Sequence, residues 1–226
     1  AQYRVNGSVR RFIDEFTVTY TPSAQALGHG REMLAALPEG QPCLFGIGNP
    51  LPLPEGASPL EFARPEVEEI QKLFDKPSKL LYETDATRPA VEKGLGTAAY
   101  LHLSCHGQFN AEDPLSSGVI LSNGEMITLR DLIARPLLKG TRLAVLSACQ
   151  TAITDFNKLP EEAIGLPAGF LQAGVPGVVG SLWPVNDLST ALLMIKFYQY
   201  HLRGDARTGE GPMPPALALR RAQLWL

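Results

Sequence analysis

The sequence predicts an α/β protein with a mostly parallel central sheet covered by helices. Five short apolar runs, rich in aliphatic and β-branched residues, have the composition of buried strands. Segments with helical periodicity or capping signals lie between them, and this alternation of strand and helix is typical of parallel sheets. The predicted strands are residues 43–48, 80–82, 100–104, 144–146 and 178–183.

The composition is that of a single globular domain. The chain has 226 residues, of which 45% are hydrophobic and 19% charged, so it can form one large core. A formal net charge of −3 provides no attraction to nucleic acid or to an anionic membrane. No apolar run approaches the roughly 18 residues of a membrane helix and no cationic leader opens the chain, so we expect a cytoplasmic protein. We expect one domain, part of a longer protein, with a peripheral segment over residues 1–40 and a core over residues 41–226.

Helix signals mark the segments between the strands. Pro65 stands in the first turn of one predicted helix, with Glu66 near its positive end. Thr128 is a predicted N-cap and Gly174 a predicted stop. Asn-Gly at 123–124 is a strong hairpin signal, which predicts a hairpin over residues 117–128. The predicted helices are residues 64–74, 86–93, 129–134, 160–173, 188–202 and 216–226.

The first 42 residues carry weaker signals. Residues 1–10 are typical of an edge strand or a hairpin, and the alternation in residues 16–20 predicts a further strand. Ser23 is the predicted cap of a short helix over residues 24–27. Glycine, proline and charged residues then predict a loop over residues 28–42, with a helical turn inside it.

Two predicted strands end next to residues that can do nucleophilic chemistry. Residues 100–104 run into Cys105 and His106, and residues 144–146 run into Ser147 and Cys149. Roughly 40 residues separate the histidine from the second cysteine, enough for one helical crossover back to a parallel strand. The carboxyl ends of parallel strands meet at one edge of a sheet, where α/β proteins bind their ligands. A nearby imidazole raises the thiolate fraction of a cysteine, so His106 and Cys149 form a candidate catalytic dyad.

The motifs around this pair are similar to those of a known family. Ser-Cys-His-Gly (104–107) and Leu-Ser-Ala-Cys-Gln-Thr (146–151) are followed by a Gly-Leu-Pro-Ala-Gly-Phe-Leu-Gln-Ala-Gly segment (165–174) and by Val-Val-Gly-Ser-Leu-Trp-Pro-Val-Asn-Asp (178–187). This combination resembles the CHAT domain family, which is related to caspases and separases. The resemblance covers about residues 40 to 226. It implies a caspase-like three-layer α/β/α sandwich and a cysteine endopeptidase that cuts protein or peptide substrates.

The implied chemistry is acyl transfer through the dyad. Cys149 attacks a peptide carbonyl, and His106 acts as general acid for the leaving amine. The backbone N–H groups of Gly107 and Cys149 are the expected oxyanion donors, because a residue without Cβ allows close approach of a substrate oxygen. The competing interpretations are a packed core thiol for Cys149 and a loop histidine without catalytic role for His106.

Three residues are candidates for the substrate pocket. Residues 182–187 resemble a separase stretch whose acids serve a basic side chain before the cut, with Pro184 here in place of the first acid. Asp187 remains a candidate, although it is equally typical of a helix N-cap. Trp183 is a candidate pocket wall or an ordinary core residue, and Asp155 follows the proposed nucleophile in the chain.

The resemblance and the residues also leave alternatives open. The family resemblance implies gating by tetratricopeptide-repeat or other regulatory domains, and the dyad chemistry requires no cofactor. A catalytically silent interaction module is the main alternative. A small-molecule acyl-transfer or redox enzyme is a weaker one, and its only candidate resolving cysteine near Cys149 is Cys105. Three cysteines without framework spacing indicate reduced thiols, and no Cys-x-x-Cys pair indicates a metal site.

Overall fold

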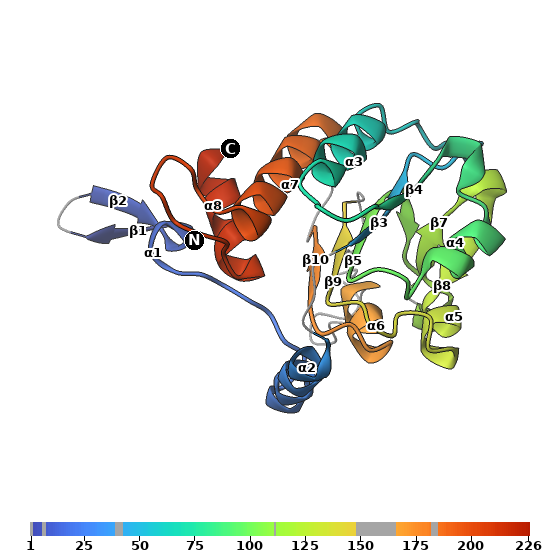
Figure 1. Cartoon of the computed structure of the whole chain (residues 1–226), viewed down its shortest axis with the longest axis horizontal. Coiled ribbons are helices and arrows are strands. Elements are labelled where there is room, and N and C mark those ends of the chain that lie inside the picture. The colour runs from blue at the N-terminus through green and yellow to red at the C-terminus, as the bar shows by residue number, and fades with distance from the viewer. Residues whose placement is uncertain (1, 6–7, 39–42, 111, 148–165, 182–184) are drawn as a thin grey trace.

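The computed structural model contains a five-stranded sheet in which all neighbouring strands are parallel (Figure 1). It describes the whole chain except residues 1, 6–7, 39–42, 111, 148–165 and 182–184. The strand order is β10-β9-β5-β3-β4, so β5 is the central strand. The five strands are β3 (Leu44–Gly48), β4 (Lys79–Tyr82), β5 (Tyr100–Ser104), β9 (Leu143–Leu146) and β10 (Val178–Gly180).

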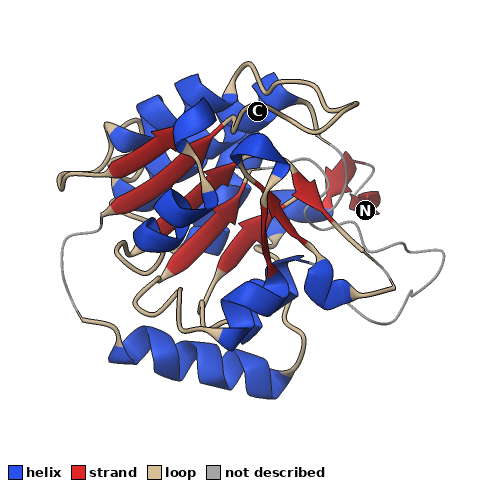
Figure 2. Cartoon of the chain, turned by 90° about the vertical axis from the view of Figure 1, so that its right-hand side faces the viewer, coloured by secondary structure: helices blue, strands red, loops and turns tan. Residues whose placement is uncertain are grey.

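Helices cover both faces of this sheet, which confirms the predicted three-layer architecture (Figures 1 and 2). One face carries α3 (Ala63–Gln71), α7 (Asp187–Leu202) and α8 (Pro215–Trp225). The other face carries α4 (Arg88–Gly94), α5 (Leu129–Ala134) and α6 (Leu166–Gln172). No helix in the described part of the chain combines the length and apolarity that a bilayer crossing requires.

The central strand divides its side chains between two cores. Leu101 and Leu103 pack with the α4, α5 and α6 side, and Cys105 continues this face beyond the strand end. Tyr100 belongs to the core beneath α3, α7 and α8. His102 and Ser104 alternate with the leucines and are fully buried, so this second face carries polar groups deep inside the protein.

A small antiparallel sheet begins directly after His106. It consists of β6 (Gly107–Gln108), β7 (Gly118–Ile120) and β8 (Met126–Thr128). The predicted hairpin is confirmed, and its Asn-Gly turn has positive φ at Asn123 (61°) and Gly124 (69°), the conformation that these residue types tolerate best. Thr128 caps α5 as expected, because its hydroxyl accepts from the Asp131 N–H and the Asp131 carboxylate accepts from the Thr128 N–H.

The N-terminal segment departs from the expected structure in two places. The predicted hairpin is present as β1 (Gln2–Val5) and β2 (Ser8–Arg11), followed by α1 (Phe12–Glu15). Residues 16–20 form no strand, which corrects the prediction. Their exposed side chains alternate in the strand manner, but they pair with no strand among the described residues. Helix α2 (Ala24–Ala36) is capped by Ser23 as expected, but it continues through two glycines where a loop was predicted. Three short 3₁₀ turns complete the described elements: η1 (Glu83–Asp85), η2 (Pro114–Ser116) and η3 (Ser122–Gly124).

The hairpin beside His106 provides a test of the fold. A Cβ at Gly118 would lie 2.2 Å from the backbone oxygen of Ile127, so Gly118→Ala must displace the β7–β8 pairing. We expect a loss of about 1–3 kcal/mol in the free energy of unfolding, measured by urea denaturation. Gly28→Ala in α2 is the matched control, since nothing lies within 4 Å of its Cβ and alanine favours helix. Equal stability of the two variants would contradict the β7–β8 packing described here.

Candidate active site

The two strands that lead to the proposed dyad are direct neighbours. β5 and β9 pair in parallel, with Leu103 opposite Leu146, and the Ser147 N–H donates to the Leu103 carbonyl over 3.0 Å. The prediction that these strands lie side by side is therefore confirmed. His106 follows Ser104 by two residues, and Cys149 follows Ser147 by two residues. Cys149 itself lies outside the described residues.

A backbone carbonyl orients the imidazole of His106. The Nε2 atom lies 2.8 Å from the carbonyl oxygen of Ser58, in the loop after β3. A carbonyl only accepts, so Nε2–H is the donor, and in the neutral ring Nδ1 then carries the lone pair. No side-chain pattern in the sequence marks this partner, because any residue supplies a carbonyl. The ring is partly exposed, as a histidine that meets substrate must be.

The peptide after His106 has the geometry expected of an oxyanion donor. Gly107 lies opposite Val119 in the β6–β7 ladder, and the Ile120 N–H donates to the His106 carbonyl over 2.8 Å. In an antiparallel ladder this pattern makes Gly107 and Val119 a non-hydrogen-bonded pair. The ladder therefore does not use the Gly107 N–H, which points away from β7.

A buried carboxylate lies beneath the ends of β5 and β9, and the sequence analysis missed it. Glu66 in α3 is 1% exposed. Its Oε2 accepts from the Ser104 hydroxyl over 2.7 Å, and its Oε1 accepts from the Ser147 hydroxyl over 2.5 Å. His102 Nε2 lies 3.1 Å from Oε1. Glutamate in the first turn of a helix is so common that only its burial distinguishes Glu66 from its exposed neighbours in α3.

The other cysteines occupy different environments. Cys105 is fully buried on the sheet face opposite Ser104, and burial raises the pKa of its thiol to about 12. Such a thiol is protonated and shielded, which argues against a resolving role for Cys105. Cys43 is partly buried against the same core, as predicted for a packed thiol. Among the residues that the structure describes, no three His, Cys, Asp or Glu side chains are grouped to hold a metal ion.

One of the three predicted pocket residues is described. Asp187 is the first residue of α7, and its Oδ2 accepts from the Phe62 N–H over 2.9 Å. The N-cap interpretation of Asp187 is wrong, because the Asn186 side chain caps the helix by accepting from the Ser189 N–H. Phe62 belongs to the same loop as Ser58, so one loop contacts both Asp187 and His106. Asp155 and Trp183 lie outside the described residues.

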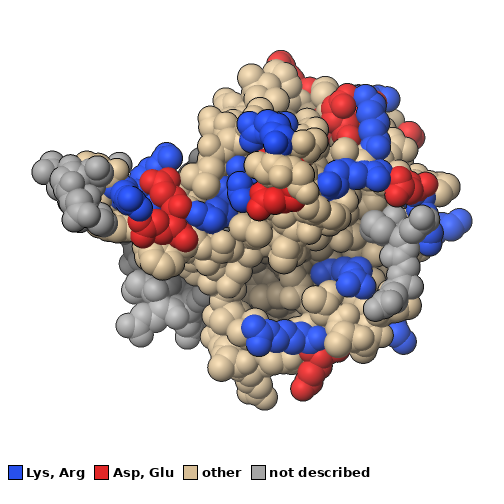
Figure 3. All heavy atoms as spheres, turned by 60° about the vertical axis from the view of Figure 1, so that its left-hand side comes forward, with Lys and Arg blue, Asp and Glu red and all other residues tan. Residues whose placement is uncertain are grey.

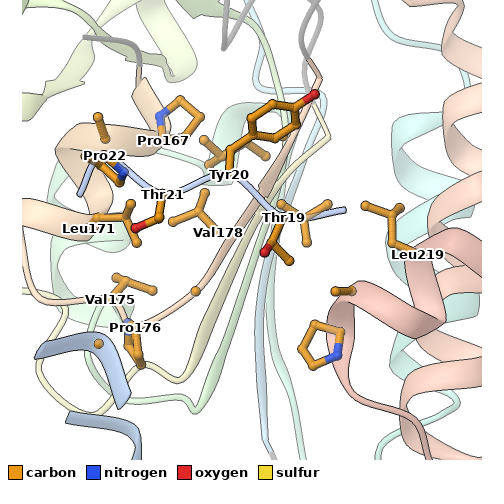
Figure 4. A pocket seen from close by; sticks show the side chains of 18 of the residues that line it. Thr19, Tyr20, Thr21, Pro22, Pro167, Leu171, Val175, Pro176, Val178 and Leu219 are labelled. Carbon is orange, nitrogen blue, oxygen red and sulfur yellow. The ribbon is translucent and has the colours of Figure 1, made fainter. Parts of the chain in front are cut away.

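A large apolar groove opens beside β10, away from His106. Figure 4 shows Val178 of β10 facing the extended residues 19–21, with Leu219 of α8 on the opposite wall. The groove reaches Leu146 and Ser147 at the end of β9, but His106 does not line it. Figure 3 shows a hollow in this side of the molecule whose floor is uncharged. A continuous exposed apolar surface of this kind is typical of a binding face.

The comparison with known sequences agrees with this architecture. No curated protein matches the chain. A family model, the CHAT domain, matches residues 2–226, almost the entire sequence. The match covers both strands of the proposed dyad, the loop that orients His106 and all six helices that cover the central sheet. The chain therefore belongs to the CHAT domain family, whose fold is the caspase-like sandwich seen here.

Proposed function

We propose that this protein is a cysteine endopeptidase in which Cys149 is the nucleophile and His106 the general acid and base. The observation that carries this proposal is the pairing of β5 with β9, because it brings the ends of the His106 and Cys149 strands to one point of the sheet edge. The Ser58 carbonyl supports the proposal, since it holds the proton of the neutral ring on Nε2 and directs the lone pair of Nδ1 toward catalysis.

The acylation step uses groups of this chain alone. Nδ1 of His106 accepts the thiol proton, and the Cys149 sulfur attacks the peptide carbonyl. The carbonyl oxygen becomes an oxyanion, which the N–H groups of Gly107 and Cys149 stabilise. His106 then donates its proton to the leaving amine, and the acyl group remains on sulfur as a thioester.

Deacylation repeats the cycle with water. His106 takes a proton from a water molecule, whose oxygen attacks the thioester carbonyl, and the proton returns to the departing sulfur. The hydrogen bond to Ser58 stabilises the imidazolium formed in each half-reaction, because a backbone carbonyl dipole favours the adjacent positive charge.

We further propose that tetratricopeptide-repeat or other regulatory domains gate this activity. The apolar groove beside β10 supports such docking, because it is adjacent to Ser147 and the strand that leads to Cys149. A partner in the groove would contact the nucleophile strand without occupying the His106 side. The substrates are proteins or peptides, bound at the sheet edge near the loop that contacts Asp187.

The reactivity of Cys149 tests the dyad directly. We expect an electrophile to label Cys149 with an apparent pKa below the ordinary value of about 8.5, so that labelling near pH 6.5 exceeds that of a free thiol roughly 10- to 50-fold. His106→Ala should abolish this excess. Cys105→Ser should leave it unchanged, because the Cys105 thiol is buried and its pKa is about 12. Peptide mass spectrometry across pH measures each cysteine separately.

Two outcomes would contradict the proposal. Slow labelling of Cys149 that does not depend on His106, with or without native flanking domains, would indicate a non-catalytic interaction module. Fast labelling without cleavage of any peptide-library member, again with the flanking domains present, would indicate an acyl-transfer enzyme of another class. Cys149→Ala is the control for cleavage by a contaminating protease.

Asp187 has a structural contact that must be separated from any pocket role. Asp187→Ala removes the acceptor of the Phe62 N–H, and we expect the free energy of unfolding to fall by about 1–2 kcal/mol. Asp187→Asn retains an acceptor oxygen and should recover most of that stability. Thermal unfolding measures this difference. A pocket role would appear in Asp187→Asn as weaker preference for lysine or arginine before the cut, while equal losses in both variants would contradict the hydrogen-bonding role.

A further inference from the structure

The carboxylate of Glu66 joins three elements in the interior of the protein. It projects from α3 and binds the hydroxyl of Ser104 at the end of β5 and the hydroxyl of Ser147 just after β9. Glu66 and Ser104 are each 1% exposed, and Ser147 is 8% exposed. Each carboxylate oxygen takes one serine, so the group spans the two strands as a bridge.

Stability alone does not explain a carboxylate at this place. Transfer of a carboxylate into a protein interior is unfavourable, and hydrogen bonds from neighbouring groups only offset this loss. Apolar side chains of similar size are often equally stable in such positions. The neighbours here are the two hydroxyls, His102 Nε2 at 3.1 Å and, from α7, the fully buried Tyr198. The bridge therefore indicates a requirement other than core packing.

The spacing of the two serines indicates what the requirement is. Ser104 precedes His106 by two residues, and Ser147 precedes Cys149 by two residues. The backbone ladder joins the same two strand ends through the Ser147 N–H and the Leu103 carbonyl. Hydrogen bonds to a charged acceptor are stronger and more directional than neutral ones, so the bridge limits sliding and separation of these ends.

We propose that Glu66 is a positioning residue that sets the separation of the strand ends carrying His106 and Cys149. This inference rests on the proposed peptidase function. Glu66 does not contact substrate; it acts through Ser104 and Ser147. A nucleophile and its base need their reacting atoms at about 3 Å, and a displacement of about 1 Å can lower the rate about 100-fold.

The test compares Cys149 labelling across pH in wild type, Glu66→Gln, Ser147→Ala, His106→Ala and the matched control Glu69→Gln. Glu69 lies in the same helix, but it is exposed and pairs with Lys72. Glutamine keeps the size of Glu66 and loses its charge, while Ser147→Ala removes one arm of the bridge without changing charge. All rates are measured well below the unfolding temperature of each variant.

We expect Glu66→Gln and Ser147→Ala to label at least about tenfold more slowly near pH 6.5, with the apparent thiol pKa moving up toward that of a free cysteine. The direction is informative. Loss of a buried negative charge would by itself favour the thiolate and lower this pKa, and a purely structural role would lower the unfolding temperature without moving the pH profile. Glu69→Gln should match wild type.

Each outcome assigns the failure to one proposal. If wild type depends on His106 but neither Glu66→Gln nor Ser147→Ala changes the profile, the positioning role is wrong and the peptidase proposal stands. If wild type itself does not depend on His106, the dyad is wrong, and the positioning role is overturned with it. If Glu66→Gln does not fold, Ser147→Ala alone decides.

Discussion

The parallel pairing of β5 with β9 is the constraint on which the rest of the molecule depends. β5 is the central strand, so its ladder with β9 is covered by helices on both faces and shielded from water. A buried backbone pair cannot exchange its hydrogen bonds with solvent, and it therefore holds its register firmly. The proposed dyad inherits its geometry from this register, since each partner stands a few residues beyond a paired position.

The loop between β3 and α3 provides the second part of the frame. It begins with Asn49, whose N–H donates to the Ser104 carbonyl over 2.9 Å and whose side chain accepts from the Leu60 N–H over 3.0 Å. The Ser58 carbonyl orients His106 from within this loop. The chain then enters α3, which carries Glu66 beneath the strand ends. A single connection thus approaches the catalytic histidine from above and the strand ends from below.

An aromatic cluster closes the interior on the side of Glu66. Phe74, Tyr100 and Tyr198 contact one another with ring centroids 5.4 to 6.4 Å apart, and the ring of His102 meets Tyr198 edge-on at 5.6 Å. Burial, with smaller contributions from Tyr100 and Glu66, raises the pKa of Tyr198 well above its usual value. The phenol remains neutral, and the cluster keeps water away from the carboxylate bridge, which strengthens its hydrogen bonds.

Local patterns in the sequence determined the kind and order of most elements, because apolar periodicity and capping residues act over a few positions. They located the central strand, the Asn-Gly hairpin, the Thr128 cap and the strand ends that carry His106 and Cys149. Contacts between distant segments were decided only by the tertiary structure. Residues 16–20 alternate like a strand but have no strand partner among the described residues, and the alternation does not show this. The Ser58 carbonyl and the burial of Glu66 are equally invisible in sequence, since a carbonyl belongs to every residue and burial depends on which elements meet.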